Sequence, residues 1–119
     1  MPATTTPQSG PVLRDVLARI GDKWTVIVIC RLADKPLRFN ELRRAAGGIT
    51  QRMLSATVRG LARDGLVTRT VLPSVPPQVE YALTPAGHGL HTVLYQLVAW
   101  TEDNLAGIQA ARAAYDEAR

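Results

Sequence analysis

Hydrophobic residues recur at helical spacings along most of this chain, but between residues 66 and 83 the pattern changes to one typical of strands. Leu66–Leu72 is rich in β-branched residues, and Gln78–Leu83 is a second short run that follows a proline-rich turn, Pro73–Pro77. Two such runs joined by a short loop predict an antiparallel hairpin with a protruding tip. Any fold for this chain must therefore place one small hairpin among helices.

Five helices are expected elsewhere, because apolar residues there are three and four positions apart. The expected helices are Pro11–Gly21, Lys23–Ala33, Asn40–Ala46, Thr50–Asp64 and a long final helix from Pro85, with a short extended piece at Leu37–Phe39. The second helix is apolar almost all round, so we expect it at the centre of the core. Its β-branched residues are also compatible with a strand, but its length and the following Pro36 favour a helix.

The length of 119 residues, with 46% hydrophobic and 20% charged residues, is typical of one folded domain. We expect a disordered tail over residues 1–9 and a single domain over residues 10–119, mainly α with a small antiparallel β-hairpin (α+β). The longest apolar run, Val26–Cys30, is far below the roughly 18 residues that span a bilayer. The N-terminus has no signal-peptide pattern. We therefore expect a cytoplasmic location and no membrane partner.

Positive charge is concentrated in the middle of the chain. Between Lys35 and Arg69 there are eight Lys or Arg residues and two acidic ones, a local charge of +6, whereas the whole chain carries +4. Seven of the eight are arginines, whose planar guanidinium groups suit bidentate contacts to phosphate or guanine. This concentration favours a nucleic-acid partner, although a solvated basic surface would look similar.

The third and fourth expected helices are joined by a tight turn at Gly47 and Gly48, and the hairpin follows directly. This order is the layout of a winged helix-turn-helix, in which the second of the two helices enters the major groove of DNA. The face of that helix opposite its apolar residues carries Gln51, Arg52, Ser55 and Arg59, all able to bond base edges or phosphates. Thr50, at the helix N-terminus, is well placed for a backbone phosphate. Such a face could also be the ordinary polar side of an amphipathic helix.

Five sequence segments, taken in chain order, make the helix-turn-helix interpretation more specific. They are Ile20–Trp24, Leu37–Arg44, Gly48–Leu54, Asp64–Arg69 and Pro76–Gly87. Together they resemble the HxlR-type family of winged helix-turn-helix transcriptional regulators, within the MarR-like superfamily. The similarity runs from about residue 10 to about residue 100.

The resemblance implies a bacterial-type cytosolic regulator that binds double-stranded DNA as a homodimer paired through its first and last helices. It places the recognition helix at Thr50–Asp64 and the wing at Pro73–Gln78. The residues expected to contact DNA are Thr50, Gln51, Arg52, Ser55 and Arg59, with Arg38, Arg43 and Gln78 as flanking contacts. Many family members have an arginine where Gln78 stands, so this wing lacks one phosphate-binding charge.

Other chemistry is poorly supported. Many family members carry a sensing cysteine where this chain has Gly10, so that chemistry is not transferred, and Cys30 lies in an apolar helix where a thiol is usually inert. His88 and His91 are too few ligands for a metal site. We find no nucleophile paired with a base and no phosphate-binding loop, so we expect no enzyme activity and no cofactor.

Two alternatives stay open at this stage. One is a winged-helix protein-interaction module without DNA binding. It would keep the core and lose the basic face, whereas this chain has Arg43, Arg44, Arg52 and Arg59. The other refines the main interpretation: a regulator gated by an unknown small-molecule effector.

Overall fold

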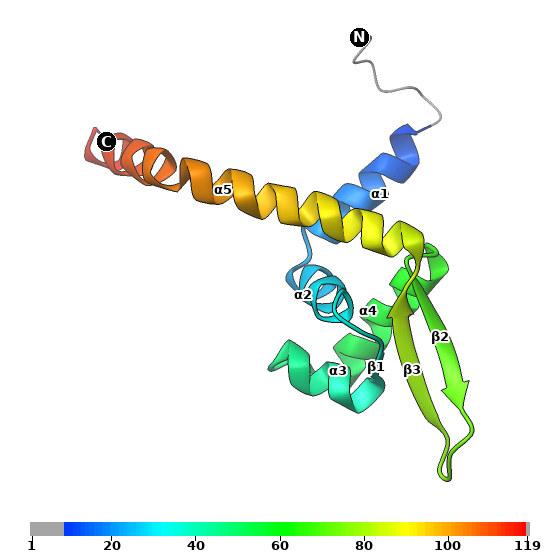
Figure 1. The fold of residues 1–119 in the computed structure, drawn as a ribbon. Helices are drawn as coiled ribbons and strands as arrows, with labels where there is room; N and C mark the ends of the chain where they lie inside the picture. Colours follow the sequence, from blue (N-terminus) through cyan, green and yellow to red (C-terminus); the bar gives the residue numbers. More distant parts are fainter. Residues whose placement is uncertain (1–8, 119) are drawn as a thin grey trace.

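The computed structural model describes residues 9–118. Within these residues, five helices and three strands follow one another in the order helix, helix, strand, helix, helix, strand, strand, helix (Figure 1). Their bounds are α1 Gly10–Ile20, α2 Lys23–Leu32, β1 Leu37–Arg38, α3 Phe39–Ala46, α4 Gln51–Arg63, β2 Val67–Leu72, β3 Gln78–Leu83 and α5 Pro85–Glu117. All five expected helices and the hairpin are therefore present. The mainly helical fold with a small antiparallel sheet is confirmed.

Helix α2 lies at the centre of the core, as its all-round apolar sequence predicts. Val28 and Ile29 have no exposed surface, and they pack in one cluster with residues of α3, α4, the sheet and α5. The largest fully buried side chains are Ile29, Leu32, Leu42, Leu54, Leu61 and Val28. Burying a side chain of this kind contributes about 1.5–3 kcal/mol relative to leaving it in water. This cluster thus holds α3 and α4 firmly against the rest of the fold.

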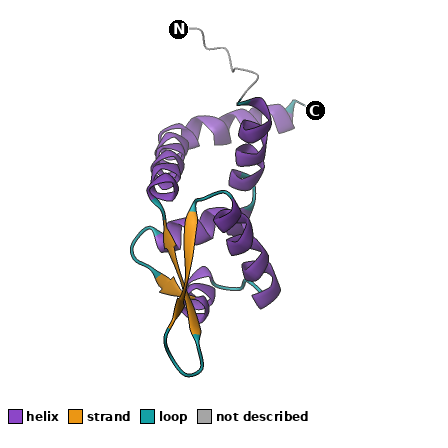
Figure 2. Ribbon diagram, turned by 90° about the vertical axis from the view of Figure 1, so that its right-hand side faces the viewer, coloured by secondary structure: helices purple, strands orange, loops and turns teal. Residues whose placement is uncertain are grey.

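The sheet has the strand order β1–β3–β2, and both pairings are antiparallel. Strands β2 and β3 form the predicted hairpin, with Val67 opposite Leu83 and Leu72 opposite Gln78. The loop at residues 73–77 forms a tip that protrudes from the molecule (Figure 2). The expected extended piece before α3 becomes a third strand, because Leu37 pairs with Tyr81 on the free edge of β3. Phe39, expected in that piece, is already the first residue of α3.

Threonine side chains cap the N-termini of α4 and α5, next to the helix starts that the sequence predicts. The hydroxyl of Thr50 accepts a hydrogen bond from the backbone N–H of Met53 at 3.1 Å, and that of Thr84 accepts one from Gly87 at 3.0 Å. Gly47 and Gly48, in the turn between α3 and α4, have φ values of +65° and +98°. Only glycine adopts such angles readily, so the turn depends on this pair.

The terminal helices α1 and α5 lie at one end of the molecule, and the hairpin tip lies at the other (Figures 1 and 2). Helix α1 has no buried residue, and α5 buries only Gly87 and Leu94 along its 33 residues. The tail predicted for residues 1–9 lies outside the described residues except for Ser9, the N-cap of α1. None of the helices in the described part is long and apolar enough for a membrane span.

Candidate nucleic-acid interface

Helix α4 has the two faces that the sequence predicts. Leu54, Val58 and Leu61 are at most 2% exposed, since they pack into the core. The polar residues on the other side are Gln51, Arg52, Ser55 and Arg59, of which only Ser55 is half-buried. Three of the four side chains are therefore open to a partner, and they extend along more than two turns of the helix.

The N-terminal end of α4 is fixed by the glycine turn and by contacts beneath it. Ile49 is buried, and the ring of Trp24 from α2 lies close to Gly48. Nε of Arg43 donates a hydrogen bond to the carbonyl oxygen of Ile49 at 3.4 Å. Arg43, predicted as a phosphate contact, thus also supports the turn that presents the helix.

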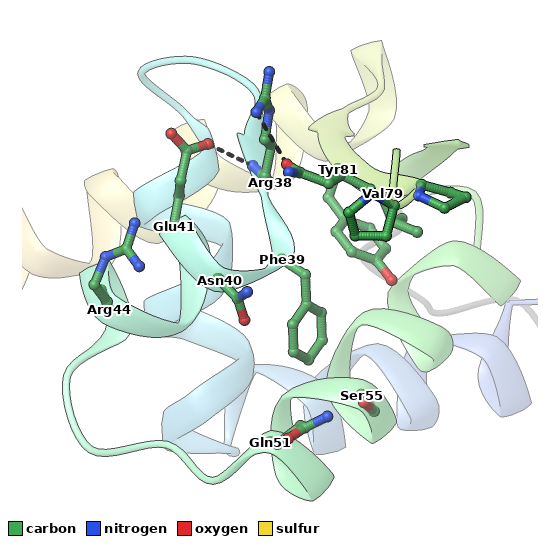
Figure 3. A pocket seen from close by; sticks show the side chains of 12 residues that line it. Arg38, Phe39, Asn40, Glu41, Arg44, Gln51, Ser55, Val79 and Tyr81 are labelled. Atoms are coloured by element: carbon green, nitrogen blue, oxygen red, sulfur yellow. Dashed lines mark hydrogen bonds between the residues drawn. The ribbon is translucent and has the colours of Figure 1, made fainter. Parts of the chain in front are cut away.

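A groove lies between the helix-turn-helix and the tip-proximal half of the hairpin (Figure 3). Gln51 and Ser55 project into it from α4, and Asn40 and Arg44 line it from α3. The far side is formed by prolines of the hairpin loop and by residues of β3, including Tyr81. The groove brings two arginines, amide side chains and the carboxylate of Glu41 together with the exposed face of α4. Such a surface suits a sugar–phosphate backbone.

Arg38 and Gln78, predicted as separate DNA contacts, meet each other at this groove. Nη1 of Arg38 donates a hydrogen bond to Oε1 of Gln78 at 2.9 Å, drawn as a dashed line in Figure 3. The backbone N–H of Arg38 donates to Glu41 at 2.8 Å, so the residue is held from both sides. The pair therefore ties the tip-proximal end of β3 to the start of α3.

This arrangement coincides with a known family over most of the chain. A family model described as HxlR-like helix-turn-helix matches residues 19–109. The chain belongs to the HxlR-like helix-turn-helix family. The match runs from the end of α1 to about three quarters of the way along α5.

Similar proteins carry regulator names. The uncharacterized HTH-type transcriptional regulator YtfH of Escherichia coli strain K12 is 37% identical over 99 residues, covering 83% of this chain and 79% of YtfH. The uncharacterized HTH-type transcriptional regulator YdeP of Bacillus subtilis strain 168 is 44% identical over 101 residues, covering 82% and 79%. The solved structure of the putative transcriptional regulator ytfH from Salmonella typhimurium is 38% identical, covers 83% of this chain and 88% of that one, and superimposes with a TM-score of 0.71.

The structure adds two arginines to the candidate interface of this HxlR-like chain: Arg44, which the sequence indicated only as part of a basic face, and Arg69, which sequence reasoning did not single out. Arg44 lines the groove beside Gln51, and Arg69 of β2 lines a hollow beside Arg59 of α4. Both belong to the segment of charge +6. That local charge was the available signal, but only the packing of α3 and the hairpin against α4 shows which face each residue joins.

Cys30 differs from its expected surroundings. The sequence predicts a buried thiol, whereas Cys30 is partly exposed on α2. In the part of the chain that the structure describes, His88 and His91 of α5 are not joined by a third metal-binding side chain. Among residues 9–118, no three His, Cys, Asp or Glu side chains lie close enough to hold a metal ion.

Proposed function

We propose that this DNA-binding transcriptional regulator of the HxlR-like family acts in the cytoplasm as a homodimer on an inverted-repeat operator. Two copies of α4 would enter successive major grooves, about 34 Å apart. The observation that carries the proposal is the exposed polar face of α4 beside the groove that ends at the hairpin. A recognition helix next to a protruding wing can contact bases and the flanking backbone together.

The position of each polar residue along α4 determines which part of the DNA it would contact. Gln51 and Arg52 lie in the first turn, where side chains of recognition helices contact base edges. Arg59 lies two turns further on, beside Arg69. Arginine pairs best with guanine and glutamine with adenine, so these residues would specify sequence. Ser55 lies between them and can bond to either a base or a phosphate.

The flanking contacts surround this face. The N-terminus of α4 carries the partial positive charge of the helix dipole, and Thr50 caps it, so a phosphate is favoured there. Arg43 and Arg44 line a hollow at the same end of the helix. Arg38 and Gln78 would contact the backbone from the wing side. These contacts would make binding strongly salt-dependent, because each phosphate neutralised releases counterions.

Apolar surface on the terminal helices supports the homodimer. Val98 and Trp100 of α5 are 55% and 56% exposed, and Leu17 of α1 is 53% exposed. Further exposed apolar residues on these helices are Val12, Leu13, Val93, Leu97 and Leu105. A monomer would leave this surface in water at a cost of roughly 25 cal/mol per Å². Pairing with a second copy through a two-fold axis would bury it.

Footprinting on the DNA upstream of the gene and its neighbours tests the proposal, at ~150 mM salt, where specific sites hold about 10³-fold or more above bulk DNA. Sedimentation at micromolar concentration gives the oligomeric state. A protected two-fold site and a dimer are expected. Weak uniform binding that salt abolishes would instead favour a protein-interaction module, and a monomer would contradict the homodimer.

A further inference from the structure

Helix α4 contains a glycine, Gly60, within its last turn and a half, where the backbone has no need of one. Its φ is not among the positive values, and glycine is less favourable than alanine inside a helix. The reason lies in its surroundings. A Cβ atom at this position would be 2.6 Å from Nη1 and 3.2 Å from Cζ of Arg19. The guanidinium group of Arg19, from α1, therefore lies directly against the backbone of α4.

The same group also reaches the end of α4. Nε of Arg19 donates to Oδ2 of Asp64, the C-cap residue of the helix. A carboxylate at this end lies next to the negative pole of the helix dipole, so a cation beside it is stabilising. The two side chains are 25% and 30% exposed, which shields the pair partly from solvent. Arg19 thus links the last turn of α1 to the last turn of α4 across 45 residues of sequence.

Helix α5 is attached to the same region. The hydroxyl of Thr84 donates a hydrogen bond to the carbonyl oxygen of Gly65 at 2.6 Å. The backbone N–H of Thr84 donates another to the carbonyl oxygen of Leu66 at 3.1 Å. Helix α1, by contrast, buries no residue of its own. Both helices with exposed apolar surface therefore meet the recognition helix at its C-terminal end, and for α1 the contact is the side chain of Arg19.

We propose that Arg19 is a positioning residue, which through Gly60 and Asp64 sets the angle between α1 and the recognition helix. This inference rests on the homodimer of the proposed function. When α1 pairs with its twin, the angle determines how far apart the two copies of α4 lie. Arg19 then controls which separation of half-sites the dimer accepts, without touching DNA.

The test compares the full-length wild type with Arg19→Ala, Gly60→Ala and Arg19→Lys. Gly60→Ala displaces the guanidinium group while leaving every charge in place, and the flexible side chain of Arg19 can move aside, so the fold should tolerate it. Arg19→Lys keeps the charge opposite Asp64. Arg14→Ala, which removes an exposed arginine from the same helix, is the matched control. Each variant is titrated against the footprinted operator, against operators with one base pair added to or removed from the spacer, and against a single half-site.

We expect Arg19→Ala and Gly60→Ala to bind the natural operator about 3- to 30-fold more weakly, the range typical of coupling mutations. Their affinity for the operators with altered spacers should fall less. The ratio of affinities for the natural and the altered spacing should therefore become smaller. Half-site affinity should stay at the wild-type value. Arg19→Lys should have most of the wild-type preference for the natural spacing, and Arg14→Ala should have all of it.

Two results would overturn the inference. If both variants keep the wild-type spacing preference, Arg19 does not set the helix separation. If the affinity of both variants falls by the same factor on every operator and on the half-site, the contact of Arg19 with α4 only stabilises the fold. Thermal melts would then show the loss of stability. In either case a dimeric wild type on a two-fold site leaves the proposed function intact. A monomeric wild type, or one without a two-fold site, would defeat the proposed function first.

Discussion

Arg38 and Gln78 lie 40 residues apart in sequence, yet Nη1 of Arg38 donates a hydrogen bond to Oε1 of Gln78 at 2.9 Å. The bond crosses from β1 to the start of β3 and so connects the helix-turn-helix to the wing. The side-chain amide of Gln78 therefore holds the guanidinium group of Arg38 beside the wing. The positive charge reaches this side of the groove through Arg38.

Arg38→Ala should weaken binding by a similar factor on all DNA sequences, because a phosphate contact carries no sequence information. The slope of log K against log salt concentration should become shallower by about 1. Gln78→Ala is the matched control, since it removes the hydrogen bond but no charge and should leave the slope unchanged. Titrations at several salt concentrations measure both. An unchanged slope for Arg38→Ala would mean that Arg38 makes no phosphate contact.

Arg52→Ala and Arg59→Ala should each cost about 1–3 kcal/mol of operator binding and relax specificity at one base pair, if each arginine contacts guanine. Affinities for the operator and for its single-base-pair variants would locate that position. Arg63→Ala, at the far end of the same helix, controls for the loss of one charge from α4. A loss of equal size on every sequence would reassign the arginine concerned to the backbone.

Local patterns were sufficient to predict which face of α4 is buried. Leu54, Val58 and Leu61 repeat at helical spacing, and Thr50 is a strong N-cap, so both features could be recognised within a few residues. The tail, the single-domain boundary and the individual DNA contacts remain predictions. The DNA contacts are tested by the binding measurements.

Contacts between distant segments could not be predicted in this way. The pairing of Arg38 with Gln78 and that of Arg19 with Asp64 join residues 40 and 45 positions apart. Nothing in the spacing of either pair distinguishes it from unrelated charged or polar residues. The third strand was missed for the same reason, because two residues are too few for an alternating pattern and Leu37 becomes a strand residue only by pairing with Tyr81.

Two glycines of α5 provide a matched test of the packing between α5 and the turn after α4. A Cβ atom at Gly87 would overlap the carbonyl oxygen of Leu66, whereas one at Gly89 would meet open space. Gly87→Ala should therefore lower the free energy of unfolding by about 1–3 kcal/mol, because backbone must move. Gly89→Ala should raise it by about 0.4–1 kcal/mol, since alanine restricts the unfolded chain and favours the helix. Urea unfolding measures both, and equal effects would contradict this packing.

Val98→Asp tests whether the exposed face of α5 is the dimer interface. Val98 is 55% exposed in the single chain, so a carboxylate there should leave the fold of one subunit intact. In a paired helix it would be buried without a partner, which costs several kcal/mol and should give monomers at micromolar concentration. Operator affinity should then fall by about 10²-fold or more, because the second half-site no longer benefits from an effective concentration.

The control is Thr92→Asp, an exposed position that is neither three nor four residues from any of the exposed apolar residues of α5 named above, so it adds the same charge away from that face. Sedimentation and titration of a single half-site complete the comparison. Half-site binding should be unchanged in both variants, since neither residue lies near α4. If Val98→Asp stays dimeric with full operator affinity, the two copies pair through another surface, and the apolar face of α5 would need a different partner.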